Sequence, residues 1–456
     1  MSSITSVGAA ARGALAALPK LELGAGSVAD LFVAGGGAKL EALLPEYLKS
    51  QRWFAGKGQA LDSVVLRGAV AVPHAGAAAD STPAGWMALV DVTRSNGAGR
   101  DLYALPIVAR PATTADTLLE PMARVHGAEG NLVLADGAGD TAFIQGLHDV
   151  IRGKGALSGG GGERLVGHPG HALEEASHGA GQLTVTPLSL HTSNTSVKLT
   201  GEDGSAQVLK IVRRHDGEVE PGAPQQALDL WKGAYLTDVA GYTHTPAVYG
   251  SIEHVAADGT ARTVGSLGEF VPNDGDSWSH ALRAVGGVLG AAAKAGTDAP
   301  AVRSGIEAYG RVARIQGQRL GELHVAFANG SSESGFIGVA ATAQDVAAAA
   351  TRLGEDAGST IAQLRGAKIQ LPSGAAVDSL EQALARRTRD ISAKLTPETV
   401  GERIHTHGDF HLGQMLAVGD DVRIVDLEGA PALPLAERWQ RASVLGDVAR
   451  NRSSFE

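Results

Sequence analysis

The sequence predicts an α+β protein with two lobes, one rich in strands and one mostly helical, behind a small mixed domain. Three observations support this prediction. Strand-like segments rich in β-branched residues cluster between residues 183 and 272, whereas residues 279–395 carry Ala, Leu and Val at helical spacing. A polar loop, residues 407–414, then leads into a short strand that ends in two carboxylates.

The length of the chain sets the domain organisation. Its 456 residues are enough for two or three domains, each with its own core. We predict an N-terminal subdomain over residues 1–105, a strand-rich lobe over 106–271 and a mostly helical lobe over 272–456.

Composition excludes several classes of protein. A content of 44% hydrophobic and 19% charged residues is typical of a globular protein. The net charge of −10 argues against a nucleic-acid or anionic-membrane partner, and no apolar run is long enough to span a membrane. Cysteine is absent, which excludes disulfides, thiolate metal sites and a thiol nucleophile. We expect a cytoplasmic protein with small-molecule partners that is a monomer or a weak homodimer.

The N-terminal region combines helices, strands and an aromatic turn. Residues 27–48 are typical of a short helix and an amphipathic helix around a Gly turn, and residues 62–71 and 86–93 are typical of strands. Between them, the basic and aromatic turn at 51–58 contains Trp53, which we expect to anchor the small domain. The sequence around Lys57 does not match a phosphate-binding P-loop.

Three histidines follow the glycine-rich loop at residues 158–163: His168, His171 and His178. A metal site would also need a carboxylate and a rigid frame, so their polar loop favours surface histidines.

The segments 193–199 and 206–214 predict a hairpin, because a Gly-containing turn at 201–204 separates them. Lys210 lies on the second strand, which is otherwise apolar. Alone, such a lysine is equally consistent with a protected sheet edge and with a phosphate ligand. The preceding turn offers N–H groups and hydroxyls that could cover phosphates in place of a glycine-rich loop: Ser193, Asn194, Thr195 and Ser196.

Two further segments match parts of a kinase lobe. A helix is expected over 224–239, and kinases use a glutamate on the corresponding helix to orient the lysine. Asp229 is the only acid there before Asp238, so its role stays open. The strand 264–272 ends near Glu269 and Val271, where the main chain of a kinase hinge would meet adenine.

The loop 407–414 has the spacing of a kinase catalytic loop. Protein kinases carry an Asp base, four residues, an Asn on Mg²⁺ and, after a strand, a second metal-binding Asp. By this spacing Asp409 is the base, Gln414 stands where the Asn stands, and Asp426 is the second metal ligand. A short motif alone matches by chance. The loop, the strand and Lys210 together favour a kinase.

On these motifs the chain resembles the aminoglycoside phosphotransferase-like kinases, and among them the actinobacterial maltokinase family. The resemblance covers most of the chain and rests on residues 51–57, 193–197, 209–210, 269–273, 321–324, 407–414, 426–431 and 435–438. It implies a bilobal protein-kinase-like fold with an N-terminal cap subdomain. It also implies Asp409 as base, Mg²⁺ on Gln414 and Asp426, and Lys210 on an ATP phosphate.

The sequence departs from the maltokinase pattern at Ala430 and Leu433, where that family usually has an acid and an arginine, and near Ala227, where it has a helix acid. The first two changes lie beside the expected sugar pocket and indicate a sugar other than maltose. Trp439 could stack on a sugar ring, or equally pack against a helix. We expect the sugar to meet Asp409, His411, Glu428, Glu437 and Trp439.

The chain is also similar to the glucosamine kinases that branch from this group. The resemblance implies conversion of glucosamine and ATP to glucosamine 6-phosphate and ADP. One alternative is a maltokinase that makes maltose 1-phosphate. A second is a non-catalytic sugar or nucleotide sensor on a kinase scaffold, and a third is a phosphotransferase acting on an aminoglycoside antibiotic.

Overall fold

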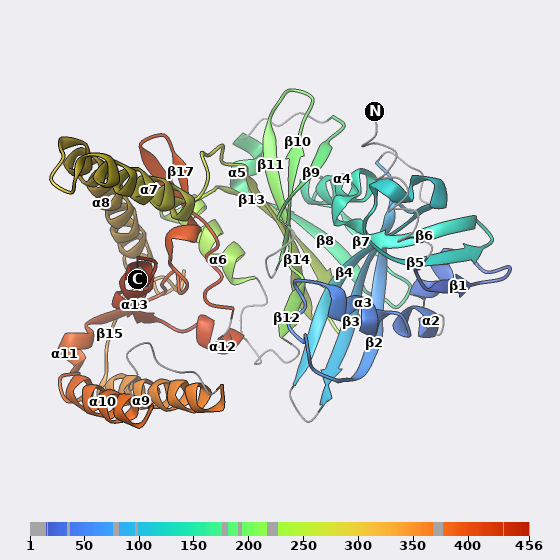
Figure 1. The fold of residues 1–456 in the computed structure, drawn as a ribbon. Coiled ribbons are helices and arrows are strands. Elements are labelled where there is room, and N and C mark those ends of the chain that lie inside the picture. The colour runs from blue at the N-terminus through green and yellow to red at the C-terminus, as the bar shows by residue number, and fades with distance from the viewer. Residues whose placement is uncertain are drawn as a thin grey trace. The chain divides into compact units, whose positions relative to one another are not determined.

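The computed structural model describes residues 15, 17–33, 37–75, 82–95, 99–175, 181–189, 194–216, 227–367, 377–431 and 433–455. The chain divides into two compact units (Figure 1). The sheet unit comprises Met1–Asn273 and Arg423–Pro431, and the helical unit comprises Asp274–Val422 and Ala432–Glu456. The segment with Asp426 therefore returns to the strand-rich unit after a long helical excursion.

The first sheet of the sheet unit is formed mainly by the N-terminal third of the chain. Its strands are β1 (Lys20–Glu22), β2 (Leu61–Val72), β3 (Gly85–Arg94), β4 (Arg100–Pro111), β5 (Leu119–Gly127), β6 (Gly130–Asp136) and β12 (Arg214–Asp216). They follow the order β1-β5-β6-β4-β3-β2, with β12 paired to β4. The subdomain boundary predicted at residue 105 falls inside β4, and the domain division itself stays a prediction.

Both faces of this first sheet are buried, because successive residues of a strand point to opposite sides. Along β3, Trp86 and Val90 belong to one hydrophobic core, whereas Met87 and Leu89 belong to another. The first core is closed by the predicted N-terminal helices η1 (Val28–Phe32), α2 (Ala38–Glu41) and α3 (Leu44–Ser50). The second is closed by α4 (Thr141–Arg152) and the second sheet.

Trp53 anchors the N-terminal subdomain as predicted. Its ring is buried, 5.9 Å from that of Tyr103, and the Arg213 guanidinium lies 5.0 Å from it. Arg213 in turn pairs with Asp136 at 2.7 Å, where both side chains are buried. This buried pair ties the chain after β11 to the end of β6.

The second sheet holds the predicted hairpin. Its order is β7-β8-β13-β14-β11-β10-β9, and every pairing is antiparallel. The strands are β7 (Ala156–Ser158), β8 (Arg164–Pro169), β9 (Thr184–Ser189), β10 (Thr195–Thr200), β11 (Ala206–Ile211), β13 (Val248–Val255) and β14 (Ala261–Glu269). Lys210 lies on β11, between β10 and β14. It does not protect a sheet edge, so that alternative is wrong.

Short helices accompany the second sheet. α5 (His171–Glu175) follows β8, and α6 (Leu228–Ala234) continues into the π-helical turn η5 (Tyr235–Val239), within the predicted helix 224–239. His168 lies on β8 and bonds Glu253, while His178 lies outside the described residues. No group of His, Cys, Asp or Glu side chains in the described chain has the arrangement of a metal centre.

The helical unit confirms the predicted helical region. Its long helices are α7 (Ser277–Ala295), α8 (Pro300–Ala328), α9 (Ala343–Gly366) and α10 (Val377–Ser392). Shorter elements complete it: α11 (Pro397–Val400), η6 (Leu412–Gln414), α12 (Leu435–Arg438), α13 (Leu445–Ser453), a sheet of β15 (Val339–Ala340), β16 (Glu402–Ile404) and β19 (Ala442–Ser443), and the hairpin of β17 (Met415–Val418) and β18 (Asp421–Ile424).

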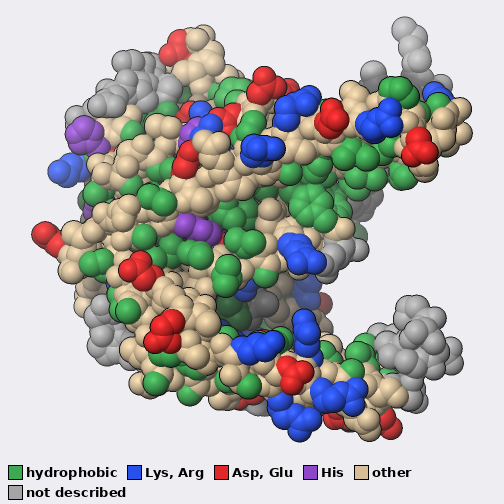
Figure 2. All heavy atoms as spheres, turned by 90° about the vertical axis from the view of Figure 1, so that its left-hand side faces the viewer, with side chains coloured by type: hydrophobic (Ala, Val, Ile, Leu, Met, Phe, Trp, Pro, Cys, Tyr) green, Lys and Arg blue, Asp and Glu red, His purple; other side chains and the backbone are tan. Residues whose placement is uncertain are grey.

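Hydrophobic side chains are visible among charged ones on the surface of the helical unit (Figure 2). On α7 and α8 the exposed ones include Leu282, Leu289 and Ile306. None of the described helices combines the length and apolarity needed to cross a membrane.

Candidate active site

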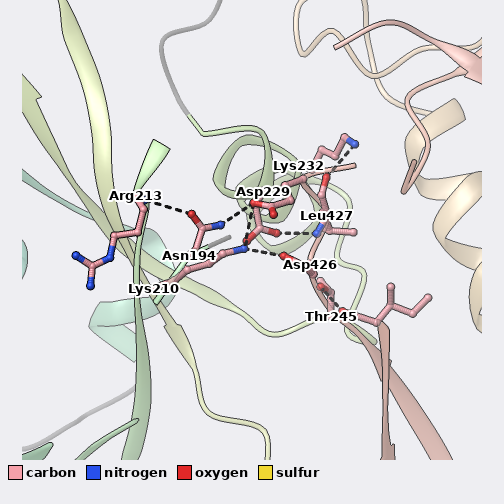
Figure 3. A network of polar contacts seen from close by, with 10 residues as sticks. Asn194, Lys210, Arg213, Asp229, Lys232, Thr245, Asp426 and Leu427 are labelled. Atoms are coloured by element: carbon pink, nitrogen blue, oxygen red, sulfur yellow. Dashed lines mark hydrogen bonds and ion pairs between the residues drawn. The ribbon is translucent and has the colours of Figure 1, made fainter. Parts of the chain in front are cut away.

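Lys210 is surrounded by three carboxylates within the sheet unit (Figure 3). Its ammonium lies 2.9 Å from Asp229 on α6 and 2.7 Å from Asp426 after β18. Glu428 follows at 3.5 Å. Asp229, whose role the sequence left open, therefore pairs with the lysine in the way that the missing helix acid would.

The charge balance of this cluster is negative. Three carboxylates against one ammonium leave a formal charge of −3 + 1 = −2. Burial alone would lower the pKa of Lys210, but the charges of Asp229, Asp426 and Glu428 raise its pKa well above the usual value. The lysine therefore stays charged, and the cluster as a whole keeps a surplus of negative charge.

Helix α6 and Thr245 hold the segment around Asp426 in place. The Leu427 N–H donates to Asp229 at 2.8 Å, and Lys232 donates to the Leu427 carbonyl at 3.0 Å. The hydroxyl of Thr245 donates to the Ile424 carbonyl at 2.9 Å (Figure 3). Asp426 has a φ of 66°, a left-handed conformation that is uncommon outside glycine and is held here by these neighbours.

The turn before β10 is attached to the same cluster. The Asn194 amide donates to Glu428 at 2.8 Å and accepts from the Arg213 N–H at 3.3 Å. Thr195 is 2% exposed, and its hydroxyl accepts from the Arg213 side chain at 3.0 Å. Ser196 lies opposite Lys210 in the β10–β11 register, and Ser193 lies outside the described residues.

The predicted hinge follows β14. The Glu269 N–H donates to the Ala247 carbonyl at 2.8 Å, and the Ala247 N–H donates to the Glu269 carboxylate at 3.1 Å. Val271 is buried, and its carbonyl accepts from the Asn273 amide at 2.9 Å. The adenine contacts assigned to this segment stay a prediction.

In the helical unit, a buried acid of α13 fixes the main chain of the loop 407–414. The carboxylate of Asp447 accepts from the His407 N–H at 2.9 Å and from the Gly408 N–H at 2.8 Å. It also bonds His324 of α8 at 3.0 Å. Burial alone would raise the pKa of Asp447, but the bond from His324, the charge of His407 and the Gly408 amide lower it overall.

Asp409 follows directly after this anchored pair of residues. Its N–H donates to the buried His407 ring at 3.3 Å, and its side chain is partly exposed. A single partly exposed carboxylate on a fixed main chain is the arrangement that a catalytic base requires.

The sequence did not identify Asp447, and it included His324 only within the segment 321–324 of the family resemblance. Asp447 lies 40 residues beyond His407 on a short helix, and no local pattern connects them. The motif at 321–324 pointed to His324. Only the tertiary structure showed that this histidine bonds Asp447.

The remaining site residues predicted in the helical unit lie in or next to η6 and α12. Gln414 ends η6, with its N–H donating to the His411 carbonyl at 2.9 Å. The His411 ring accepts from the Gly413 N–H at 3.0 Å. Glu437 on α12 pairs with Arg352 at 2.7 Å, and Trp439 is half-buried just beyond. Glu437 is therefore already neutralised by an arginine.

Parts of the chain are similar in sequence to known proteins. Residues 47–140 match the family described as the maltokinase N-terminal cap domain. The chain is 27% identical over 265 residues to a glucosamine kinase of Streptacidiphilus jiangxiensis, covering 56% of this chain and 50% of that one. It is 26% identical over 214 residues to a glucosamine kinase of Mycolicibacterium smegmatis, covering 46% of each. The chain spans about half the length of these curated relatives.

Solved structures share the fold. A glucosamine kinase in complex with glucosamine, ADP and inorganic phosphate has a TM-score of 0.53 at 18% identity, covering 90% of this chain and 78% of that one. A glucosamine kinase in crystal form B has a TM-score of 0.53 at 20% identity, covering 88% and 76%. These matches confirm the kinase-like α+β fold with its N-terminal cap. They also confirm that the chain is similar to the maltokinase-like proteins, in particular to their glucosamine kinase branch.

Proposed function

We propose that the chain is an ATP-dependent sugar kinase that converts glucosamine and ATP to glucosamine 6-phosphate and ADP. The observation that carries this proposal is Lys210, paired with Asp229 and adjacent to Asp426 and Glu428. The similarity to proteins named glucosamine kinase supports the choice of sugar.

The proposed reaction is a phosphoryl transfer. The sugar 6-hydroxyl oxygen forms a bond to the γ-phosphorus of ATP, and the bond from that phosphorus to the bridging β,γ-oxygen breaks. Asp409 orients the hydroxyl and accepts its proton, while ADP leaves with the bridging oxygen. The anchoring of residues 407 and 408 by Asp447 would hold Asp409 in position.

Lys210 would bind ATP phosphates, with the main chain of Asn194, Thr195 and Ser196 covering them. Residues 269–271 would bind adenine. Since Arg213 engages the hydroxyl of Thr195, we assign only the main chain of this residue to the phosphates.

The residues assigned to Mg²⁺ fit such an ion. Gln414 and Asp426 supply oxygen donors, and the cluster around Asp426 carries an excess of negative charge. When bound, Mg²⁺ would offset the charge that develops on the phosphate oxygens.

The sugar would be recognised by Glu428, His411, Glu437 and Trp439. Glu437 is paired with Arg352, and Glu428 with Lys210 and Asn194, so either carboxylate would share the sugar ammonium with an existing partner. We place the reaction in the cytoplasm and expect a monomer or a weak homodimer.

Formation of maltose 1-phosphate is the second candidate, because residues 47–140 match a maltokinase cap domain. ADP release from Mg-ATP, measured with glucosamine, glucose, N-acetylglucosamine, maltose and kanamycin, separates the candidates. Turnover confined to glucosamine, with the phosphate located on the 6-hydroxyl by ³¹P NMR, would support the proposal. Turnover on maltose alone would support the second candidate, and no turnover on any sugar would favour a sensor.

A further inference from the structure

The sheet unit contains a cavity that shares no lining residue with the Lys210 cluster. It has a volume of about 440 Å³ and lies against β2, β3 and β4 on one side and the β13–β14 hairpin on the other. A volume of this size is typical of sites for small metabolites. Charged groups dominate its wall, and the argument rests on His254, Arg262, Arg67, Arg100, Asp91 and Glu163.

His254 and Arg262 form the unusual part of this wall. They are direct partners in the β13–β14 register, so their side chains share one face of the sheet. His254 is 3% exposed, and neither ring nitrogen has a hydrogen-bond partner. Arg262 has a buried Nε without a hydrogen-bond partner, and the charges of Asp258 and Asp91 act on its guanidinium. Buried donors of this kind are costly unless a ligand or water satisfies them.

A third base adds to the same group. His215 on β12 is paired opposite Leu102, which lines the cavity, and its Nε2 is buried without a partner. Burial and the nearby charge of Arg262 lower the pKa of His215 to about 3. Burial lowers the pKa of His254 to about 4. Both rings are therefore neutral at pH 7, and Arg262 supplies the positive charge of the group.

The remaining charges limit the charge of the ligand. Arg67 and Arg100 both donate to Asp91, at 2.7 and 2.6 Å. Glu163 accepts from the Ala69 N–H, and Asp258 of the exposed turn accepts from the Thr260 N–H. Three arginines and three acids line the cavity, so a polyanion would meet repulsion and a single anionic group is favoured.

We propose that this cavity binds a small organic acid whose single carboxylate is held by Arg262 and His254. A carboxylate matches the fork of a guanidinium and would give the imidazole N–H an acceptor. The site is independent of the proposed kinase reaction. Strand β14 connects the two regions, because Ser266 of this strand is paired with Lys210 in β11.

The experiment uses the full chain without ATP, so that its outcome does not depend on turnover. Saturation-transfer NMR measures binding of acetate, lactate, pyruvate, 3-hydroxybutyrate and benzoate, with lactamide and inorganic phosphate as comparisons. The variant R262Q removes the proposed ligand. R164Q is the matched control, because Arg164 is an exposed arginine on the neighbouring strand β8 and does not line the cavity.

We expect at least one carboxylate to bind, with its Kd raised about tenfold or more in R262Q. R164Q should bind as the wild type does, and lactamide should not bind. H254Q, checked for folding by circular dichroism, should weaken the same carboxylate. The proposal would be overturned if no carboxylate binds, if R262Q binds as tightly as R164Q, or if only inorganic phosphate binds.

Discussion

Asp229 bonds two groups that are far apart in the sequence. It lies 19 residues after Lys210 in sequence and holds both the lysine ammonium and the Leu427 N–H. A carboxylate with two such bonds positions the lysine and the Asp426 segment together. Without Asp229, Lys210 would keep only the carboxylates of Asp426 and Glu428.

We predict that D229N lowers kcat/KM for ATP by about tenfold or more, because a charge-assisted bond to Lys210 is lost. D238N is the control, since Asp238 is an exposed acid on the same helical segment. Steady-state kinetics with Mg-ATP and glucosamine measure the change. Equal kinetics of the two variants would remove Asp229 from this role.

The base assigned in the loop gives a second prediction. Replacing Asp409 with Asn should lower kcat by about two decades or more, the usual size of a general-base contribution, with little change in stability. D420N, in the exposed turn after the loop, should keep its activity. Turnover of D409N close to that of the wild type would contradict the assignment.

Asp447 predicts a pH dependence of stability. The folded-state pKa is lowered, so the unfolded chain binds more protons, and the contribution of Asp447 is fully present above the unfolded pKa. It is lost as pH falls below about 4 and through the folded pKa. At pH 7, D447N should cost about 1–3 kcal/mol, because buried N–H groups lose a charged acceptor.

The difference in the free energy of unfolding between D447N and the wild type should therefore become smaller as pH falls. Urea unfolding between pH 3 and pH 7 measures it, with D390N on the exposed face of α10 as the control. A difference that stays constant down to pH 3 would show that the carboxylate charge is not the source of the stabilisation.

At the scale of elements, the two sheets of the sheet unit are joined by a buried ion pair. Arg213 and Asp136 are 1% and 2% exposed and lie 2.7 Å apart. Removing one partner leaves the other charge buried, which is a more serious loss than that of an exposed pair.

R213M should therefore lower the free energy of unfolding by about 3–5 kcal/mol. R365M should have no measurable effect, because Arg365 pairs with Asp378 and Glu381 on the surface. Denaturant unfolding monitored by circular dichroism compares the two variants. A loss in R213M no larger than in R365M would show that the pair does not stabilise the sheets.

Single helices and strands were easier to predict from the sequence than the order in which the strands pair. The hairpin of β10 and β11 and the long helices follow local periodicity and were predicted correctly. The place of β11 in its sheet was not predicted, because strand order depends on partners such as β14 that lie far along the chain. Only that order excluded Lys210 as a residue protecting a sheet edge.

At the scale of the whole molecule, the proposed function requires the folded chain to bind Mg-ATP. A ligand that binds only the folded chain stabilises it by mass action. With Mg-ADP at about a hundred times its Kd, we expect about 2.7 kcal/mol of stabilisation, seen as a higher Tm by scanning fluorimetry.

Chelation with EDTA should remove most of this gain, and D426N should lose its Mg²⁺-dependent part. D390N should respond as the wild type does. An increase in Tm with ADP that is the same with and without Mg²⁺ would argue against the metal ligands assigned to Gln414 and Asp426.

The sequence by itself determined the kinase-like α+β plan, the hairpin with Lys210 and the spacing from Asp409 to Gln414, because these depend on periodicity and on short-range motifs. Only the tertiary structure decided which acid pairs with Lys210, which acid anchors residues 407 and 408, and that His254 and Arg262 share the wall of a cavity. The physical reason is that Asp229, Asp447 and Arg262 act through long-range contacts. Such contacts are set by the packing of whole elements and leave no pattern in the neighbouring residues.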